Sequence, residues 1–251
     1  MRPLLRPSKW PWLTTLSIGL ILYSIDPMGL YSVEIEPEVT EWLGSFSDRD
    51  FGRVDQYVGM LAEKAETLSE PWSRNLGDGL RELRFHLHPL EMRITYWLAP
   101  GRRVVLLTVF RKTRMRETLE VDRAKVLRKV CEVEHEHARI SFDRKVRDMT
   151  EHQSMDDIRR ERFNRPGFDA TEYHAGREEA KLAIELADAI RERRLELGLT
   201  QTQLAQRAGL HQPDVSRLES GGGTPTIGML DRLAHALELR FVARFEKPDA
   251  A

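Results

Sequence analysis

The 251-residue sequence contains a single cysteine, Cys131, so it cannot form an internal disulfide. This scarcity excludes a disulfide-stapled scaffold and favours a reducing compartment, which we take to be the cytoplasm. An excess of charge is also missing, because 39 lysines and arginines face 40 aspartates and glutamates. The balance argues against a bulk polycationic nucleic-acid binder, although a total can hide local fields. With 251 residues, of which 41% are hydrophobic, the chain is long enough and apolar enough to form one or two domains with buried cores.

Long hydrophobic runs are lacking apart from Trp10–Ile25 near the N-terminus. This run is shorter than the roughly 18–20 apolar residues of a spanning helix, and Pro11 and Gly19 interrupt it. Basic residues precede it, as in a secretory signal, but no A-x-A cleavage site follows. Three interpretations stay open: residues 1–27 lie upstream of a true start at Met28, form a weak anchor, or act as a signal. We expect no stable membrane association.

Residues 28–137 have the pattern of one α+β domain. The expected elements are a strand at 31–35, a helix from 37, a helix from 48, strands at 80–86, 92–98 and 104–110, and a helix at 117–134. Pro71 and the turn Gly77–Gly79 break the chain before the three longer strands, and Pro89 and Pro100-Gly101 separate them. This order predicts a small, mostly antiparallel sheet with helices on one face.

The remainder of the chain is expected to be mainly helical. Residues 138–181 are charged and form an ordered or semi-ordered connector, in which Ser154 and Asp157 cap a short helix. Residues 182–247 form a second, all-α domain that ends in a strand at Phe241–Phe245.

The segment Gln201–Ser220 has the pattern of a helix-turn-helix unit. Thr200 and Gln203 form a capping box at its start, and Gly209 supplies the turn between two short helices. The residues expected in the shared core are Leu204, Ala205, Leu210, Val215 and Leu218. In such a unit the second helix enters the major groove of DNA. A purely structural helical hairpin is the alternative.

With Leu197–Gln201 and Ser216–Glu219, this segment resembles the Xre/Cro-type repressor family over residues 183–245. The resemblance implies operator DNA as a partner, and a homodimer on two half-sites. The residues implied to contact DNA are Gln201, Gln212, Pro213 and Arg217. Glutamine pairs with adenine and arginine with guanine, whereas proline offers only apolar contact. His211 stands where the family usually has a serine or threonine cap.

Cations are concentrated between Gly101 and Lys129, where ten basic and three acidic residues give a net charge of +7. Such a cluster suits phosphate binding and stabilisation of a charged transition state. A solvated, charged strand end is the alternative.

The motifs around this cluster resemble the RelE superfamily of ribonuclease toxins, most closely its HigB or phage Gp49-like branch. They are Asn75–Arg84 (NLGDGLRELR), Met92–Tyr96 (MRITY) and Val105–Thr113, and the resemblance covers residues 30–135. It implies metal-independent cleavage of mRNA, commonly on the ribosome, with no cofactor. The ribose 2′-OH attacks the adjacent phosphate, which requires a base, a charge stabiliser and a proton for the leaving oxygen.

Residue roles follow from the same resemblance. Arg84 and Arg93 are implied to bind phosphate, and Lys112 to stabilise charge or assist proton transfer. The residues implied to hold the RNA backbone are Arg111, Arg114 and Arg116. Either Arg111 or Lys112 stands at the position of the family's catalytic lysine, and the sequence leaves this assignment open. His86 and His88 are acid/base candidates or ordinary surface histidines, and Glu134–His137 is only superficially like a metal site.

The connector also resembles a known segment. Arg165–Tyr173 and Glu178–Ile190 are similar to the leader of HigA-type antitoxins, so the chain is identified as a toxin joined to its antitoxin. The expected function is a DNA-binding repressor whose ribonuclease domain is held inactive by intramolecular contact with the second half, favoured by the tether. The alternative is a pure transcription regulator whose first domain serves dimerisation or sensing.

Overall fold

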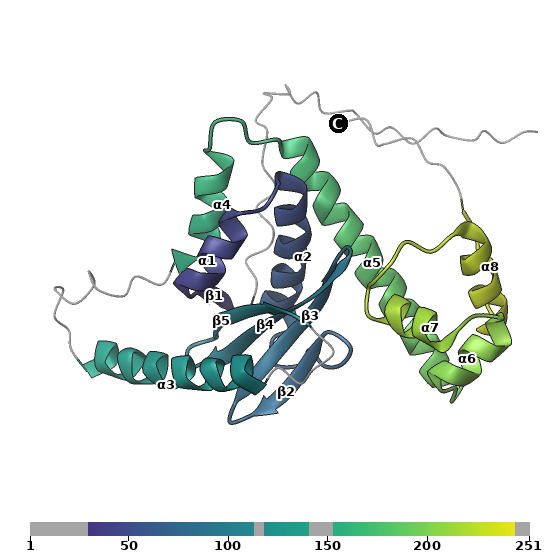
Figure 1. Cartoon of the computed structure of the whole chain (residues 1–251), viewed down its shortest axis with the longest axis horizontal. Helices are drawn as coiled ribbons and strands as arrows, with labels where there is room; N and C mark the ends of the chain where they lie inside the picture. The colour runs from purple at the N-terminus through teal and green to yellow at the C-terminus, as the bar shows by residue number, and fades with distance from the viewer. Residues whose placement is uncertain (1–29, 113–117, 141–152, 244–251) are drawn as a thin grey trace, which may run out of the picture.

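A computed structural model describes residues 30–112, 118–140 and 153–243 of the chain. The sheet has six strands in the order β2-β3-β4-β5-β1-β6 (Figure 1). Their bounds are β1 Ser32–Ile35, β2 Ser73–Gly77, β3 Leu80–Leu87, β4 Leu90–Ala99, β5 Arg103–Arg111 and β6 Gln153–Ser154. Strands β2 to β5 pair antiparallel, whereas β1 pairs parallel with β5.

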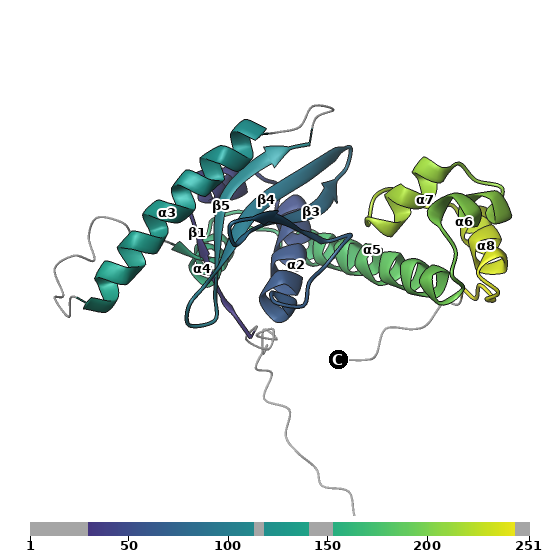
Figure 2. The same cartoon turned by 90° about the horizontal axis from the view of Figure 1, so that it is seen from below.

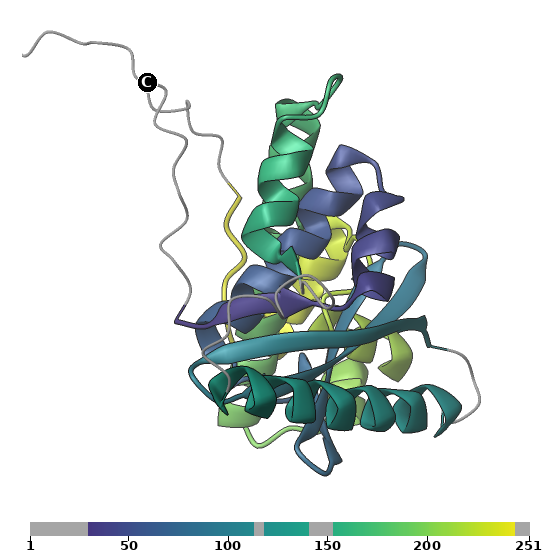
Figure 3. The same ribbon diagram turned by 90° about the vertical axis from the view of Figure 1, so that its left-hand side faces the viewer.

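The expected α+β class and the three long strands are confirmed, but two details of the expected sheet were wrong. First, the sequence interpretation assigned no structure to Ser73–Gly77, which forms strand β2. The turn at Gly77–Gly79 joins this strand to β3 as a hairpin. Second, helices cover both faces. Helix α3 (Thr118–Ile140) packs on the face opposite to the other helices, as Figures 2 and 3 show. Its Ala124 and Cys131 share a core with Trp97.

The main core lies on the other face of the sheet, under α1 (Pro37–Gly44), α2 (Asp48–Lys64), α4 (Met155–Phe163) and the first part of α5 (Ala170–Glu196). Ser47 caps α2 and Ser154 caps α4, as expected, each accepting a backbone N–H bond three residues on. The expected connector therefore contains ordered helices, whose Met155, Ile158 and Tyr173 are buried with the α2 side chains.

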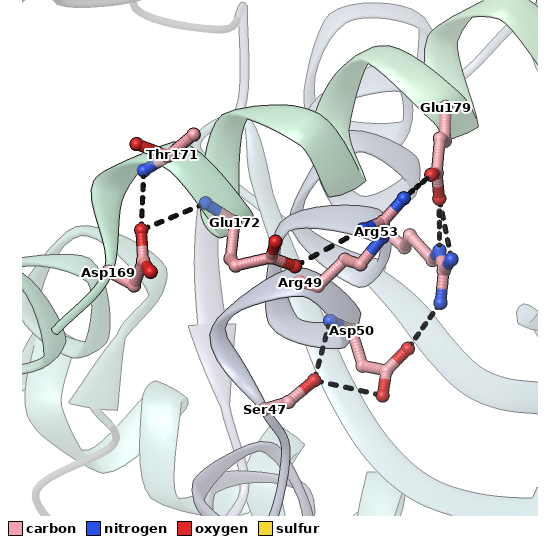
Figure 4. A network of polar contacts seen from close by, with 8 residues as sticks. All are labelled: Ser47, Arg49, Asp50, Arg53, Asp169, Thr171, Glu172 and Glu179. Atoms are coloured by element: carbon pink, nitrogen blue, oxygen red, sulfur yellow. Dashed lines mark hydrogen bonds and ion pairs between the residues drawn. The ribbon is translucent and has the colours of Figure 1, made fainter.

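Helices α2 and α5 approach so closely that their backbones are in contact. A Cβ atom added to Gly176 would lie 1.9 Å from the carbonyl oxygen of Arg49, and one added to Gly52 would lie 2.2 Å from that of Tyr173. Ion pairs line the same contact (Figure 4): Arg53 pairs with Glu179 at 2.5 Å, and Arg49 with Glu172 at 3.2 Å. The sheet domain, defined as β1–β6 with α1–α4, is thus fixed to α5.

Helix α5 continues from this core into a second one (Figure 1). Ala187 is buried with the sheet domain, whereas Ile190, one turn on, is buried with the helix-turn-helix unit. This unit comprises α6 (Gln201–Ala208), α7 (Gln212–Glu219) and α8 (Ile227–Ala236). The expected strand at 241–245 is not formed by residues 241–243, and residues 244 and 245 lie outside the described part.

Candidate nucleic-acid interface

The structure brings Arg84, Arg93 and Lys112 together at one end of the sheet. Arg84 on β3 lies directly opposite Arg93 on β4, so both side chains project from the same face. Lys112 follows β5, and its backbone N–H donates a 2.8 Å hydrogen bond to the carbonyl oxygen of Glu91 on β4. Residues widely separated along the chain thus form one cationic cluster.

Glutamates of the sheet domain neutralise this cluster. Arg84 pairs with Glu82 at 2.7 Å, and Glu91 pairs with Lys112 at 2.8 Å and with Arg93 at 3.3 Å. Burial opposes ionisation of Glu91, but its hydrogen bond and ion pair with Lys112 outweigh burial and hold the pKa of this carboxyl below its ordinary value. The Lys112 ammonium already stabilises the negative charge of Glu91, so it can stabilise the charge of another anion in the same place. A phosphate bound here would replace the glutamate as its partner.

His86 belongs to the same site, whereas His88 is exposed. Burial lowers the pKa of His86, and three nearby cations, including Arg93 and Lys112, act in the same direction against Glu91. The closed cleft therefore favours the neutral form of the imidazole. His86 is half-buried, because Ser220 and Gly222 of the turn after α7 lie against its ring, and its role as an acid or base stays a prediction.

Of the residues implied to bind RNA, Arg111 is exposed at the end of β5, and Arg114 and Arg116 lie outside the described residues. Side chains of the Glu134–His137 segment also lie outside the description. In the parts of the chain that the structure describes, no group of three potential ligands is placed to hold a metal ion. Across those same residues, no helix combines the length and apolar character needed to cross a membrane.

The helix-turn-helix unit has the local geometry that the sequence predicts. Thr200 and Gln203 form both bonds of the capping box, and Gly209 takes a left-handed φ of 62° between α6 and α7. His211 begins α7 without a side-chain cap, as its departure from serine or threonine suggests. The expected core residues Leu204, Ala205, Val215 and Leu218 are buried, and Leu210 packs against them.

A buried ion pair, which the sequence interpretation missed, organises the DNA-contact candidates. Arg194 at the end of α5 donates two hydrogen bonds to Glu219, whose side chain is only 1% exposed. The amide of Gln201 donates to Glu219 at 2.9 Å, and the amide of Gln212 donates to Gln201 at 2.9 Å. This chain of bonds fixes both glutamines, whereas Arg217 stays 58% exposed. Spacing alone gives no signal for the pair, since the two residues are 25 positions apart.

The two sets of candidates face each other across one cleft of about 440 Å³ between the sheet domain and α7, which we call the interdomain cleft. The sheet-domain wall consists of Glu70, Pro71, Arg84, Phe85, His86, Glu91, Arg93 and Lys112. The opposing wall consists of Arg191, Gln201, Gln212, Pro213, Ser216, Arg217, Glu219 and Ser220. All three catalytic candidates and all four DNA-contact candidates therefore line the same space.

The walls meet at the turn that follows α7. The His86 Nε2 and Ser220 Oγ atoms are 3.0 Å apart and share a hydrogen bond. Gly221 packs on Trp72, since an added Cβ atom would lie 2.7 Å from that ring. The Trp72 indole N–H donates a 2.7 Å bond to Asp188 of α5, which fixes the ring at this contact.

Comparisons with known proteins agree with this two-part architecture. Residues 41–130 match the family described as "Phage derived protein Gp49-like", and residues 190–242 match the family described as "Helix-turn-helix". A protein of Methanothermobacter thermautotrophicus named "Uncharacterized HTH-type transcriptional regulator" is 46% identical over 48 residues, which are 19% of this chain and 70% of that protein. No solved structure is found to match.

The chain thus combines a Gp49-like domain of the phage toxin type with an Xre-type helix-turn-helix domain. Through the latter it belongs to the helix-turn-helix family of transcriptional regulators.

Proposed function

We propose that this chain is a fused toxin–antitoxin protein: a cytoplasmic repressor that binds the operator of its own gene as a dimer and carries an mRNA endoribonuclease domain neutralised by its second half. The interdomain cleft supports the proposal most directly, because Arg84, Arg93 and Lys112 line it opposite α7 and its following turn. An mRNA strand, on the ribosome or free, needs those cations accessible.

The proposed reaction is attack of a ribose 2′-OH on the adjacent phosphate. His86 accepts the hydroxyl proton: a general base must be deprotonated at the working pH, and Arg93 and Lys112 on the same wall disfavour protonation of His86. Arg84 and Arg93 bind the phosphate oxygens, and the Lys112 ammonium stabilises the charge that develops on them. The leaving 5′ oxygen takes its proton from the protonated His86 or from water, so no metal is needed.

A chain ending at Gly198 (residues 1–198) tests the nuclease. It keeps α4 and α5, which complete the core of the sheet domain, and lacks the unit that covers the cleft. We expect this chain to arrest growth and to cleave RNA, and the full chain to do neither. Lys112→Ala should abolish both effects, and Lys129→Ala, an exposed lysine of α3, should leave them intact. A truncated chain that is folded but inert refutes the nuclease.

One observation favours the alternative, a pure transcription regulator. Arg84, Arg93 and Lys112 are each ion-paired with a glutamate of their own sheet, so the cluster has a structural use without RNA. In that case operator binding tolerates loss of all three cations, and the truncated chain never cleaves RNA.

A further inference from the structure

The helix that should read DNA is the helix that covers the sheet domain. Figures 1 and 2 show α7 on the side of the helix-turn-helix unit nearest to the sheet. Its groove-facing candidates Gln212, Pro213 and Arg217 line the interdomain cleft together with Gln201. The surface assigned to DNA and the surface in contact with the sheet domain are therefore the same.

A DNA duplex does not fit in the cleft as it stands. The volume of the cleft is only about 440 Å³. Reading of base edges places a whole helix of about 10–12 Å diameter inside the major groove, with duplex on either side. The strands β3 and β4, which carry Arg84 and Arg93, occupy the space that the duplex would need.

The contact between the walls is small enough to be displaced by DNA. It includes the hydrogen bond between His86 and Ser220 and the packing of Gly221 on Trp72. Arg217 on one wall and Arg93 and Lys112 on the other all lower the pKa of His86, and Glu91 opposes them.

We propose that duplex DNA and the sheet domain compete for this one face of α7, so that binding of operator DNA opens the interdomain cleft and gives RNA access to Arg84, Arg93 and Lys112 together. The inference rests on the proposed function and adds its regulation. In the closed form both activities are restrained, and the apparent DNA affinity is reduced by the fraction of molecules that are open. Opening requires α5 to bend or tilt between Ala187 and Ile190, where it passes from one core to the other.

A wedge in the full-length chain tests the competition. A Cβ atom added to Gly222 would lie 2.8 Å from Arg217 Cγ on its own wall and 2.8 Å from the His86 ring on the other, so Gly222→Leu adds bulk where the walls meet. Gly228→Leu is the matched control, because nothing lies within 4 Å of an added Cβ atom there. His86→Ala, which removes the contact with Ser220 without adding bulk, is a second opening variant. Thermal unfolding verifies that each variant is folded.

The probes are a fluorescent duplex of the promoter of the protein's own gene and an unrelated duplex at low salt, where binding is mainly electrostatic. We expect Gly222→Leu to bind the promoter duplex at least about tenfold more tightly than the wild type, and His86→Ala to change affinity in the same direction. The Gly228→Leu control should match the wild type.

Unchanged or weaker promoter binding by both opening variants overturns the competition, because it means that the cleft is either irrelevant to DNA or part of the DNA site. If no variant binds either duplex, the proposed repressor function fails instead. RNA cleavage is measured separately, so a loss of DNA binding and a lack of nuclease activity are distinguishable.

Discussion

Gly176 provides the sharpest test of how the two halves are held together. In Gly176→Ala the new methyl group would lie 1.9 Å from the carbonyl oxygen of Arg49, although real Cβ atoms essentially never come within 3.0 Å of another atom. The obstacle is backbone, so no side chain can swing away, and α5 must move from α2 by about 1.1 Å. The displaced contact includes the buried side chains Phe51, Tyr173 and Ala180.

The expected net effect is a lower free energy of unfolding. Overpacking of this kind costs about 1–3 kcal/mol, and the higher helix propensity of alanine offsets about 1 kcal/mol of it. Gly59→Ala in α2 is the matched control, because nothing lies within 4 Å of its added Cβ atom. That variant should gain about 0.5–1 kcal/mol.

Urea unfolding of the full chain, followed by circular dichroism, measures both variants under the same conditions. We expect Gly176→Ala to unfold at lower urea than the wild type and Gly59→Ala at higher urea. If Gly176→Ala were as stable as Gly59→Ala, the close crossing of α2 and α5 would be refuted, and with it the rigid attachment of α5 to the sheet domain.

Three further predictions concern the helix-turn-helix unit and the cleft. Arg194→Ala leaves the buried Glu219 carboxylate without its ion-pair partner, bonded only to the Gln201 amide, and should cost about 3–5 kcal/mol, measured by thermal unfolding; a loss below about 1 kcal/mol would contradict it. Arg217→Ala should weaken promoter binding by about 1–3 kcal/mol and relax base preference at one position, and unchanged affinity would show that α7 is not the recognition helix. The pKa of His86 is lowered in the closed cleft, so its contribution to closure is complete above its ordinary value of about 6.5 and is lost as pH falls through the lowered value. Trp72 fluorescence should report this opening on acidification, and His86→Gln should remove the pH dependence whereas His88→Gln should not.

Local patterns allowed much of the fold to be predicted. The capping box at Thr200, the left-handed turn at Gly209 and the strand-like runs at 80–86, 92–98 and 104–110 each depend on neighbouring residues, and each is found. Strand β2 was missed because the segment Ser73–Gly77 is polar and lies at the edge of the sheet, where burial imposes no alternation. The placement of α3 on the opposite face depends on the path of the chain and not on its own periodicity.

The sequence predicted the separate groups of site residues but not that these groups face each other across one cleft. Motif resemblance located Arg84, Arg93 and Lys112, and local spacing located the helix-turn-helix unit. Their meeting across one cleft depends on α5 being fixed to α2 by Gly52 and Gly176, a contact between residues more than 100 positions apart. No local pattern within the chain reports a contact between residues so far apart in sequence.

The central claim is that one face of α7 restrains both halves of the protein. The most direct measurement is the rate of RNA cleavage by the full-length chain as the promoter duplex is added. The account predicts low cleavage without DNA, a rise as the duplex saturates α7, and no rise in Lys112→Ala. Cleavage that falls with added DNA, or that is already full in its absence, would contradict it.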